Sequence, residues 1–132
     1  MSLHQSRFAD LDTRLYYYYN PELIMHKREL LGEFEQIVLL AVLRLEQNAY
    51  GVPIRNEIEN RTKRSVTIGA LYSTLDRLEE KGFLSSIFSD PRPERGGRSR
   101  RYFQVQPSGI KALQRTRDAL SVMWDRVDLR KA

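Results

Sequence analysis

The chain has 132 residues, of which 41% are hydrophobic, and this suits one domain with a moderate core but not two. It contains no cysteine, which excludes a disulfide framework and a thiolate metal site and is compatible with a reducing cytoplasm. The longest apolar run, residues 37–43, is too short to cross a bilayer, and the N-terminus lacks a signal-peptide core. We therefore expect a cytoplasmic protein with no membrane partner, and the net charge of +5 favours a polyanionic partner.

Residues 1–29 are predicted to form an N-terminal arm in which a helix begins near residue 20. Asn20, Pro21 and Glu22 supply a capping amide, a proline at the first helical position and a carboxylate at the positive end of the helix dipole. The tyrosine run at residues 16–19 either belongs to a weakly ordered arm or stacks on a partner subunit or nucleic acid. We divide the rest into a domain over residues 30–106 and a C-terminal helix over residues 107–132.

Two helices are predicted to begin the main domain. Apolar residues between positions 33 and 46 cover much of the helix circumference, so we expect a central core helix that is buried on several sides. A turn at residues 48–51 leads into a short second helix, with Pro53 in its first turn and an end near Thr62. Ile54 and Ile58 would face the core from this second helix.

A third helix is predicted from Thr67, as its N-cap, to Gly82, as its terminator. The apolar stripe expected to face the core consists of Ile68, Leu71, Leu75 and Leu78. The opposite face carries Gly69, Tyr72, Ser73, Asp76 and Arg77. A lone helix of this kind is usually a solvated surface helix. Directly after a short helix and a turn, it is instead typical of a helix-turn-helix.

Residues 84–106 are predicted to form a two-stranded hairpin with a long basic tip. Proline and glycine are dense between residues 91 and 97, and short apolar segments flank them. The arginines in or beside the tip are Arg92, Arg95, Arg98, Arg100 and Arg101. Arginine pairs with phosphate and fits a narrow minor groove, so this hairpin would be a DNA-binding wing. The fold class is therefore mainly α with a small two-stranded β-wing, a winged helix-turn-helix followed by a C-terminal dimerisation helix.

The last helix is predicted to start at Pro107–Ser108–Gly109, with Ser108 as its N-cap. A heptad-like seam favours dimerisation, and the alternative is packing on the chain's own domain. The predicted dimer interface consists of Ile110, Leu113, Leu120, Trp124 and Val127. Trp124 would anchor this interface, and a small aromatic effector is a further candidate ligand for it.

Four segments carry a family resemblance. They are the turn at Tyr50–Gly51, the sequence G-A-L-Y-S-T-L-D-R-L-E-E-K-G-F-L from Gly69, G-R-S-R-R-Y-F from Gly97 and P-S-G from Pro107. Over about residues 30–127 the chain resembles the PadR family of winged-helix transcriptional regulators. The resemblance implies a homodimer that represses transcription, with its third helix in the major groove and its wing along the backbone or in the minor groove. It implies phosphate contacts for Tyr72, Arg98 and Arg100, and a base-facing position for residues 63–73.

The residues themselves support a division of labour on double-stranded DNA. Lys63, Arg64 and the wing would hold phosphates, whereas polar side chains on the third helix would read base edges. The predicted contacts of the recognition helix and its turn are Lys63, Arg64, Ser65, Thr67, Gly69, Tyr72, Ser73 and Arg77. Those of the wing are Arg95, Arg98, Arg100 and Arg101. We expect a sequence-specific regulator, a repressor that binds a pseudo-palindromic operator as a homodimer.

Two alternatives keep the same fold. A winged-helix protein-interaction module would not bind duplex, and a nonspecific architectural DNA-binding protein would bind it without sequence preference. An enzyme is not expected, because the two histidines, His4 and His26, lie outside the predicted core and no nucleotide-binding loop or metal-ligand spacing occurs. No cofactor is predicted.

Overall fold

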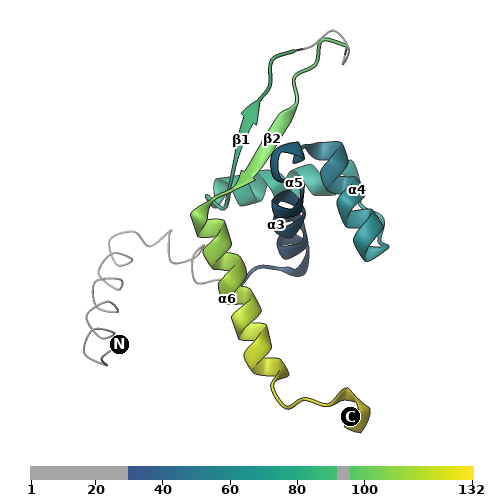
Figure 1. The fold of residues 1–132 in the computed structure, drawn as a ribbon, viewed down its shortest axis with the longest axis vertical. Helices are drawn as coiled ribbons and strands as arrows, with labels where there is room; N and C mark the ends of the chain where they lie inside the picture. The colour runs from purple at the N-terminus through teal and green to yellow at the C-terminus, as the bar shows by residue number, and fades with distance from the viewer. Residues whose placement is uncertain (1–29, 92–95) are drawn as a thin grey trace, which may run out of the picture.

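The computed structural model describes residues 30–91 and 96–132, and its elements follow the predicted order (Figure 1). The helices are α3 (Glu33–Leu45), α4 (Gly51–Thr62), α5 (Ile68–Glu80) and α6 (Pro107–Trp124), with short 3-10 turns η1 (Glu46–Asn48) and η3 (Leu129–Lys131). The strands are β1 (Leu84–Phe88) and β2 (Arg101–Val105). The predicted arm, with its tyrosine run, lies outside the described residues, as do Arg92 and Arg95.

Helix α3 is the central element, because it contacts α4, α5, α6 and β2. Val38, Leu39 and Val42 are almost completely buried and form the middle of the core. The prediction that α3 is buried on several sides is only partly right, because Leu40 and Leu43 remain 48% and 40% exposed. These two side chains border an apolar groove between α3 and α4.

The ends of α5 follow the predicted capping chemistry. Thr67 Oγ1 accepts a hydrogen bond from the Ala70 N–H at 3.2 Å, and Gly82 adopts a φ of +80°. The Phe83 N–H returns to the Leu78 carbonyl at 2.9 Å, which completes the hydrogen-bond pattern of a glycine-terminated helix. Gly82 is therefore confirmed as the residue that lets the chain leave the helix.

The core face of α5 differs from the prediction at one position. Leu71, Leu75 and Leu78 are fully buried as expected, but Ile68 is 40% exposed and Thr74 is buried instead. Ile68 is the first residue of the helix, where the chain has only just left the α4–α5 loop. The apolar stripe therefore begins one turn later than the sequence pattern indicated, and Ile68 lies on the solvent-facing side.

The wing is the predicted antiparallel hairpin, in which Leu84 pairs with Val105, Ser86 with Phe103, and Phe88 with Arg101. Leu84 and Phe103 are buried at its base, whereas Phe88 near its tip is 69% exposed. The Phe103 N–H also donates to the Ala49 carbonyl at 2.8 Å, which ties β2 to the turn between α3 and α4. In Figure 1 the two strands rise side by side from the helices at the base of the wing.

Helix α6 packs on its own domain through its first half only. Gly109, Ala112 and Thr116 are buried, and the Thr116 hydroxyl accepts from the Leu31 N–H at 3.0 Å and donates to the Ala112 carbonyl at 2.8 Å. The predicted N-cap at Ser108 is wrong: the N-cap is Gln106, Pro107 is the first helical residue, and the Ser108 hydroxyl donates to the Gly82 carbonyl at 2.6 Å.

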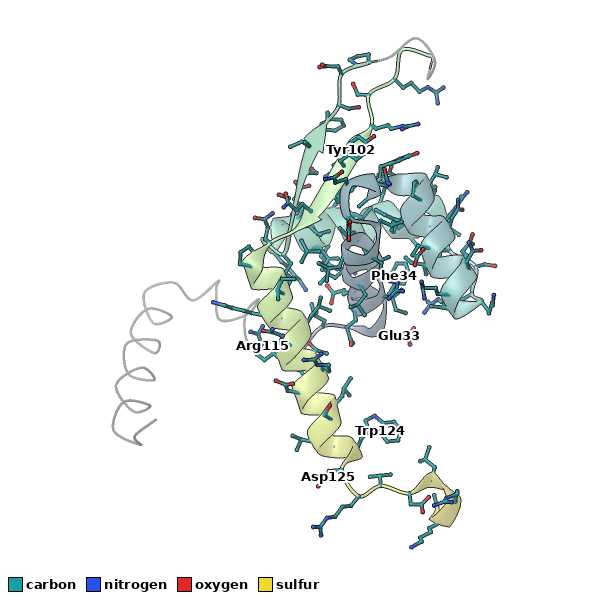
Figure 2. The ribbon with its side chains drawn as sticks, in the orientation of Figure 1. Glu33, Phe34, Tyr102, Arg115, Trp124 and Asp125 are labelled. Carbon is teal, nitrogen blue, oxygen red and sulfur yellow. The ribbon has the colours of Figure 1, made fainter. Side chains whose placement is uncertain are left out.

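The second half of α6 extends away from the winged domain, and Figure 2 shows Trp124 on this extension. Leu120 and Trp124 are 45% and 57% exposed. The helix ends at Trp124, so the predicted helical seam does not reach Val127, which follows a turn at residues 125–126. Within residues 30–91 and 96–132, no helix is both long and apolar enough to cross a membrane.

Glu35 connects the start of α3 to the end of α5. Its carboxylate is buried, accepts from the Gly32 N–H at 3.0 Å and from Lys81 Nζ at 3.1 Å, and lies 3.5 Å from Arg77 Nε. Burial by itself would raise the pKa of Glu35, but the Gly32 and Lys81 hydrogen bonds and both cations outweigh it and lower the pKa below its usual value of 4.5. The charged form is therefore the one that the fold favours.

We expect Glu35→Gln to lower the free energy of unfolding at pH 7 by about 1–3 kcal/mol, because it leaves a buried cation without its partner. Since the folded pKa is depressed, the contribution of the carboxylate is fully present above 4.5 and is lost as the pH falls through the folded pKa. Urea unfolding at pH 7 and at steps down to about pH 3 should show the two proteins converging in acid. Glu33→Gln is the control, because Glu33 is 78% exposed in its pair with Arg64 and should change stability by less than about 1 kcal/mol. Equal losses in the two variants would contradict this account.

Candidate nucleic-acid interface

The outer face of α5 is polar and uncovered. Gly69 and Ser73 are exposed on it, and the Thr67 hydroxyl is used to cap the helix. Ile68 adds an exposed apolar side chain at the first turn, which the sequence pattern had placed in the core. A helix face with hydroxyl, glycine and small apolar groups offers both hydrogen bonds and methyl contacts, which are the two kinds of contact that read base edges.

A basic groove lies where the N-terminus of α4, the side of α5 and the wing meet. Its volume is about 770 Å³. The residues that line it are Tyr50, Gly51, Val52, Tyr72, Phe88, Arg98, Ser99, Arg100 and Arg101. The structure thus brings four of the predicted DNA contacts together: Tyr72, Arg98, Arg100 and Arg101.

Tyr72 reaches this groove because residue 51 has no side chain. A Cβ placed on Gly51 would lie 3.0 Å from Tyr72 Cζ and closer still to the hydroxyl oxygen. The ring therefore lies directly over the first turn of α4. The N-cap residue Tyr50 makes no side-chain capping hydrogen bond, so the N-terminal end of α4 can still accept an anion.

The wing is linked to α4 by an aromatic cluster. The rings of Tyr50 and Tyr102 meet edge to face with centroids 5.4 Å apart, and the Arg100 guanidinium lies 4.4 Å from the Tyr50 centroid. A hydrogen bond with Tyr102 raises the pKa of Arg100, so this cation is permanent at any physiological pH. The cluster holds one wing arginine at the mouth of the groove with its charge intact.

The other predicted cations lie in different surroundings. Arg64 is paired with Glu33 and lies 5.2 Å from the Phe34 ring centroid, at the start of α3, and Figure 2 labels both partners. Arg77 points to Glu35. Lys63 and Ser65 are exposed in the loop before α5, Arg98 is exposed beside the wing tip, and Arg95 falls among the residues that are not described.

Arg101 differs from its neighbours because its side chain turns toward α5. Its guanidinium bonds to Asp76 at 2.8 Å, to Glu79 and to the Ser86 hydroxyl at 3.1 Å, and only 22% of the side chain is exposed. Burial alone would lower the pKa of Arg101, but the hydrogen bonds to Asp76 and Glu79 outweigh it and raise the pKa. Its cationic charge is largely neutralised within the protein.

Sequence reasoning assigned no role to Tyr50, Gly51 or Val52, which form one wall of the groove. Gly51 is the residue that could have indicated this wall, because the sequence places it in a turn motif with Tyr50. Its contact with Tyr72, however, depends on how α4 packs against α5 and cannot be predicted from the local sequence. Among residues 30–91 and 96–132, no group of three or more His, Asp or Glu side chains could hold a metal ion.

Comparison with known proteins identifies the family. The sequence profile of the "Transcriptional regulator PadR-like family" matches residues 39–115, from the middle of α3 through the wing to the first half of α6. The chain belongs to the PadR-like family. It is also 32% identical over 80 residues to a Lysinibacillus sphaericus protein named "Uncharacterized protein X", covering 59% of this chain and 69% of that protein.

Solved structures of PadR-like regulators share the fold. A PadR family transcription regulator from Clostridium difficile R20291 superposes with a TM-score of 0.57 at 22% identity, covering 68% of this chain and 90% of its own. A PadR-like transcription factor from Bacteroides fragilis gives 0.58 at 24% identity, covering 79% and 91%. A PadR family regulator from Eggerthella lenta gives 0.56 at 20% identity, covering 91% of each chain. The family profile makes this protein a PadR-family transcriptional regulator, and the solved structures show that it shares their fold.

Two glycine substitutions test the geometry of the groove in this PadR-family protein. Gly51→Ala should lower the free energy of unfolding by about 1–3 kcal/mol, because the new methyl group forces the Tyr72 ring out of its place. Gly69→Ala is the matched control, since no atom lies within 4 Å of its added Cβ, and helix propensity should leave stability unchanged or raise it by up to about 1 kcal/mol. Thermal unfolding of both variants measures the difference. Equal stability of the two would mean that the half-exposed Tyr72 ring moves aside for the methyl group at no cost, and that its place over Gly51 contributes nothing to stability.

Proposed function

We propose that this PadR-family regulator is a repressor that binds a pseudo-palindromic operator in double-stranded DNA as a homodimer. The observation that carries the proposal is the basic groove, because it joins the wing to the polar face of α5 on one side of the molecule. A phosphate held in this groove would fix the register of α5 against the neighbouring base pairs. Residues 30–106 are the DNA-binding part in this proposal, and residues 107–132 the dimerisation part.

Phosphate contacts come from the wing and the groove. Arg98 and Arg100 supply charge, and the Tyr72 hydroxyl and the N-terminus of α4 supply neutral donors. Lys63 and Arg64 extend these contacts along the α4–α5 loop, with Arg64 leaving its exposed pair with Glu33. Arg95 would add to the wing contacts.

Base recognition is assigned to the exposed face of α5 and the loop before it. Ser65 and Ser73 reach base edges, Gly69 permits close approach, and Ile68 contacts a thymine methyl group. Thr67 and Arg77, which are engaged with the Ala70 N–H and Glu35, complete the predicted set. This division makes affinity depend on salt and specificity depend on α5.

Dimerisation is assigned to the C-terminal helix. The exposed apolar side chains there are Leu120, Val122, Met123, Trp124, Val127 and Leu129. Such a cluster on a regulator of this size is typical of an interface between subunits. Ile110 and Leu113, the other two residues proposed for it, are half-buried, and Leu113 packs against the chain's own core. A two-fold axis would place the two copies of α5 about 34 Å apart, in successive major grooves. A flat aromatic effector beside Trp124 would then change this spacing.

The first test is fluorescence anisotropy with duplex from the chain's own upstream region and with a scrambled duplex, from low to physiological salt. We expect tight binding to the first duplex at physiological salt and weak, salt-sensitive binding to the second. Arg98→Ala should weaken binding to both duplexes and reduce the salt slope by about one phosphate. Ser73→Ala should instead alter sequence preference with little change in slope.

Each alternative gives a distinct result in this experiment. Equal, salt-sensitive binding to both duplexes would indicate an architectural protein that lacks a specific operator. An absence of binding to either duplex, together with no effect of Arg98→Ala, would indicate a protein-interaction module. A salt slope unchanged by Arg98→Ala would exclude the wing as a phosphate contact.

The oligomeric state is tested separately. Trp124→Ser combined with Leu120→Ser should raise the dissociation constant of the dimer at least tenfold, because each buried apolar side chain contributes about 1.5–3 kcal/mol. Sedimentation velocity over a concentration series measures this shift. Ile87→Ser is the matched control, since Ile87 is 71% exposed on the wing and its loss should leave the dimer unchanged. A wild-type protein that is monomeric at micromolar concentration would refute the dimer.

A further inference from the structure

The guanidinium of Arg101, the first residue of β2, joins this strand to both α5 and β1. Its Nη1 bonds to Asp76 and its Nη2 to Glu79, which are three residues apart on α5, and its Nε bonds to the Ser86 hydroxyl on β1. The Ser86 hydroxyl in turn donates to the second oxygen of Glu79 at 2.7 Å. Every nitrogen of the guanidinium therefore has a partner, and all the partners belong to this chain.

The surroundings of Arg101 suit a structural cation better than a phosphate contact. The guanidinium lies 4.8 Å from the centroid of the buried Phe103 ring and 6.0 Å from that of Phe88, the residue that pairs with Arg101. The Ser86 hydrogen bond, followed by the bonds from Arg101, lowers the pKa of Glu79, so the carboxylate stays charged. A phosphate that approached Arg101 would meet the two carboxylates Asp76 and Glu79 at close range. Like charges at such distances repel.

The wing needs contacts with the helices to keep a fixed position. An isolated two-stranded hairpin is only marginally stable in water, and beyond the pair Ser86–Phe103 the β1 side chains Ile87 and Phe88 are about 70% exposed. The stack of Arg100 on Tyr50 holds the wing to α4. Among the described contacts, the Arg101 cluster is the one that holds the outer half of the wing to α5.

We propose that Arg101 is a positioning residue that clasps the wing to the recognition helix, and that it does not contact DNA phosphate. The clasp fixes the distance between the phosphate contacts at the wing tip and the base-reading face of α5, so that both meet the same duplex. This role in recognition rests on the proposed DNA-binding function, whereas the clasp itself is a property of the free protein. Its effect on affinity comes through preorganisation of the wing.

The test compares two variants that break the same contact, one by removing its positive charge and the other by removing its two negative charges. One variant is Arg101→Gln, and the other is Asp76→Asn combined with Glu79→Gln. Both break the clasp, so both should speed amide hydrogen exchange in β1 and β2 of the free protein and weaken DNA binding about 5–30-fold, with the salt slope unchanged. The triple variant should be no worse than either, because all three substitutions remove one shared interaction.

A phosphate contact at Arg101 would give the opposite pattern. Arg101→Gln would then lower the salt slope by about one phosphate, and removal of the two carboxylates would strengthen DNA binding. Either result would overturn the proposal, as would hydrogen exchange of the wing that is the same in wild type and in both variants. Arg98→Gln serves as the control, because it should change the salt slope without changing exchange in β1 and β2.

The experiment separates this proposal from the broader one. If the wild-type protein binds no duplex, the proposed function fails, but the exchange measurements on the free protein still decide whether the clasp exists. If Arg101→Gln does not fold, the carboxylate variant, which leaves every arginine in place, carries the same comparison. Amide hydrogen exchange that is faster in the variants, with duplex affinity unchanged, would show that the clasp exists but has no role in recognition. That result would overturn the proposal that the clasp positions the wing for DNA binding.

Discussion

The functional face of this protein depends on one junction, the hydrogen bond from the Phe103 N–H to the Ala49 carbonyl. Phe103 buries its ring in the core at the base of the wing, and Ala49 is buried in the turn that precedes α4. Because the two backbones are joined there, the wing must emerge beside the N-terminus of α4. The core that stabilises the fold is thus also what places Arg100 against Tyr50 and opens the basic groove next to α5.

Around this junction the arginines fall into two groups, although they look alike in the sequence. Arg101 and Arg77 pair with carboxylates on α5 and α3 and connect elements of the fold, although Arg77 is itself 51% exposed. Arg98 and Arg100 line the groove, and the Arg100 guanidinium lies against the Tyr50 ring and bonds to Tyr102, so it keeps its charge available to a polyanion. The net charge of +5 therefore does not show which cations are available to a partner. The positions of the carboxylates decide that, because a paired cation is largely neutralised within the protein.

Much of the architecture could be predicted from local chemistry. Thr67 and Gly82 mark the ends of α5 because capping and positive φ are properties of single residues, and the hairpin follows from its short apolar segments. The failures have a common physical cause. Ile68 and Ser108 were assigned from spacing and residue type alone, whereas their surroundings are set by how α5 leaves its loop and by the Gly82 carbonyl beside α6. Likewise, the partners of Arg101 lie 15 to 25 residues away, beyond the reach of any local pattern.

The exposed apolar side chains of the C-terminal helix α6 do not follow the heptad seam that was predicted for a dimer interface. Gly109, Ala112 and Thr116 face the chain's own core, so the first half of α6 has little apolar surface left for a partner. The second half exposes more apolar surface than a single helical seam would cover. Val122 and Met123 are both 74% exposed and do not lie on the helix face that carries Leu120 and Trp124. A partner helix that covered Leu120 and Trp124 alone would leave these two side chains in water. The proposed dimer interface would therefore have to wrap around the end of α6. In such a dimer the width of the interface, more than its heptad spacing, would set how firmly the two copies of α5 are held at the separation that the proposed operator requires.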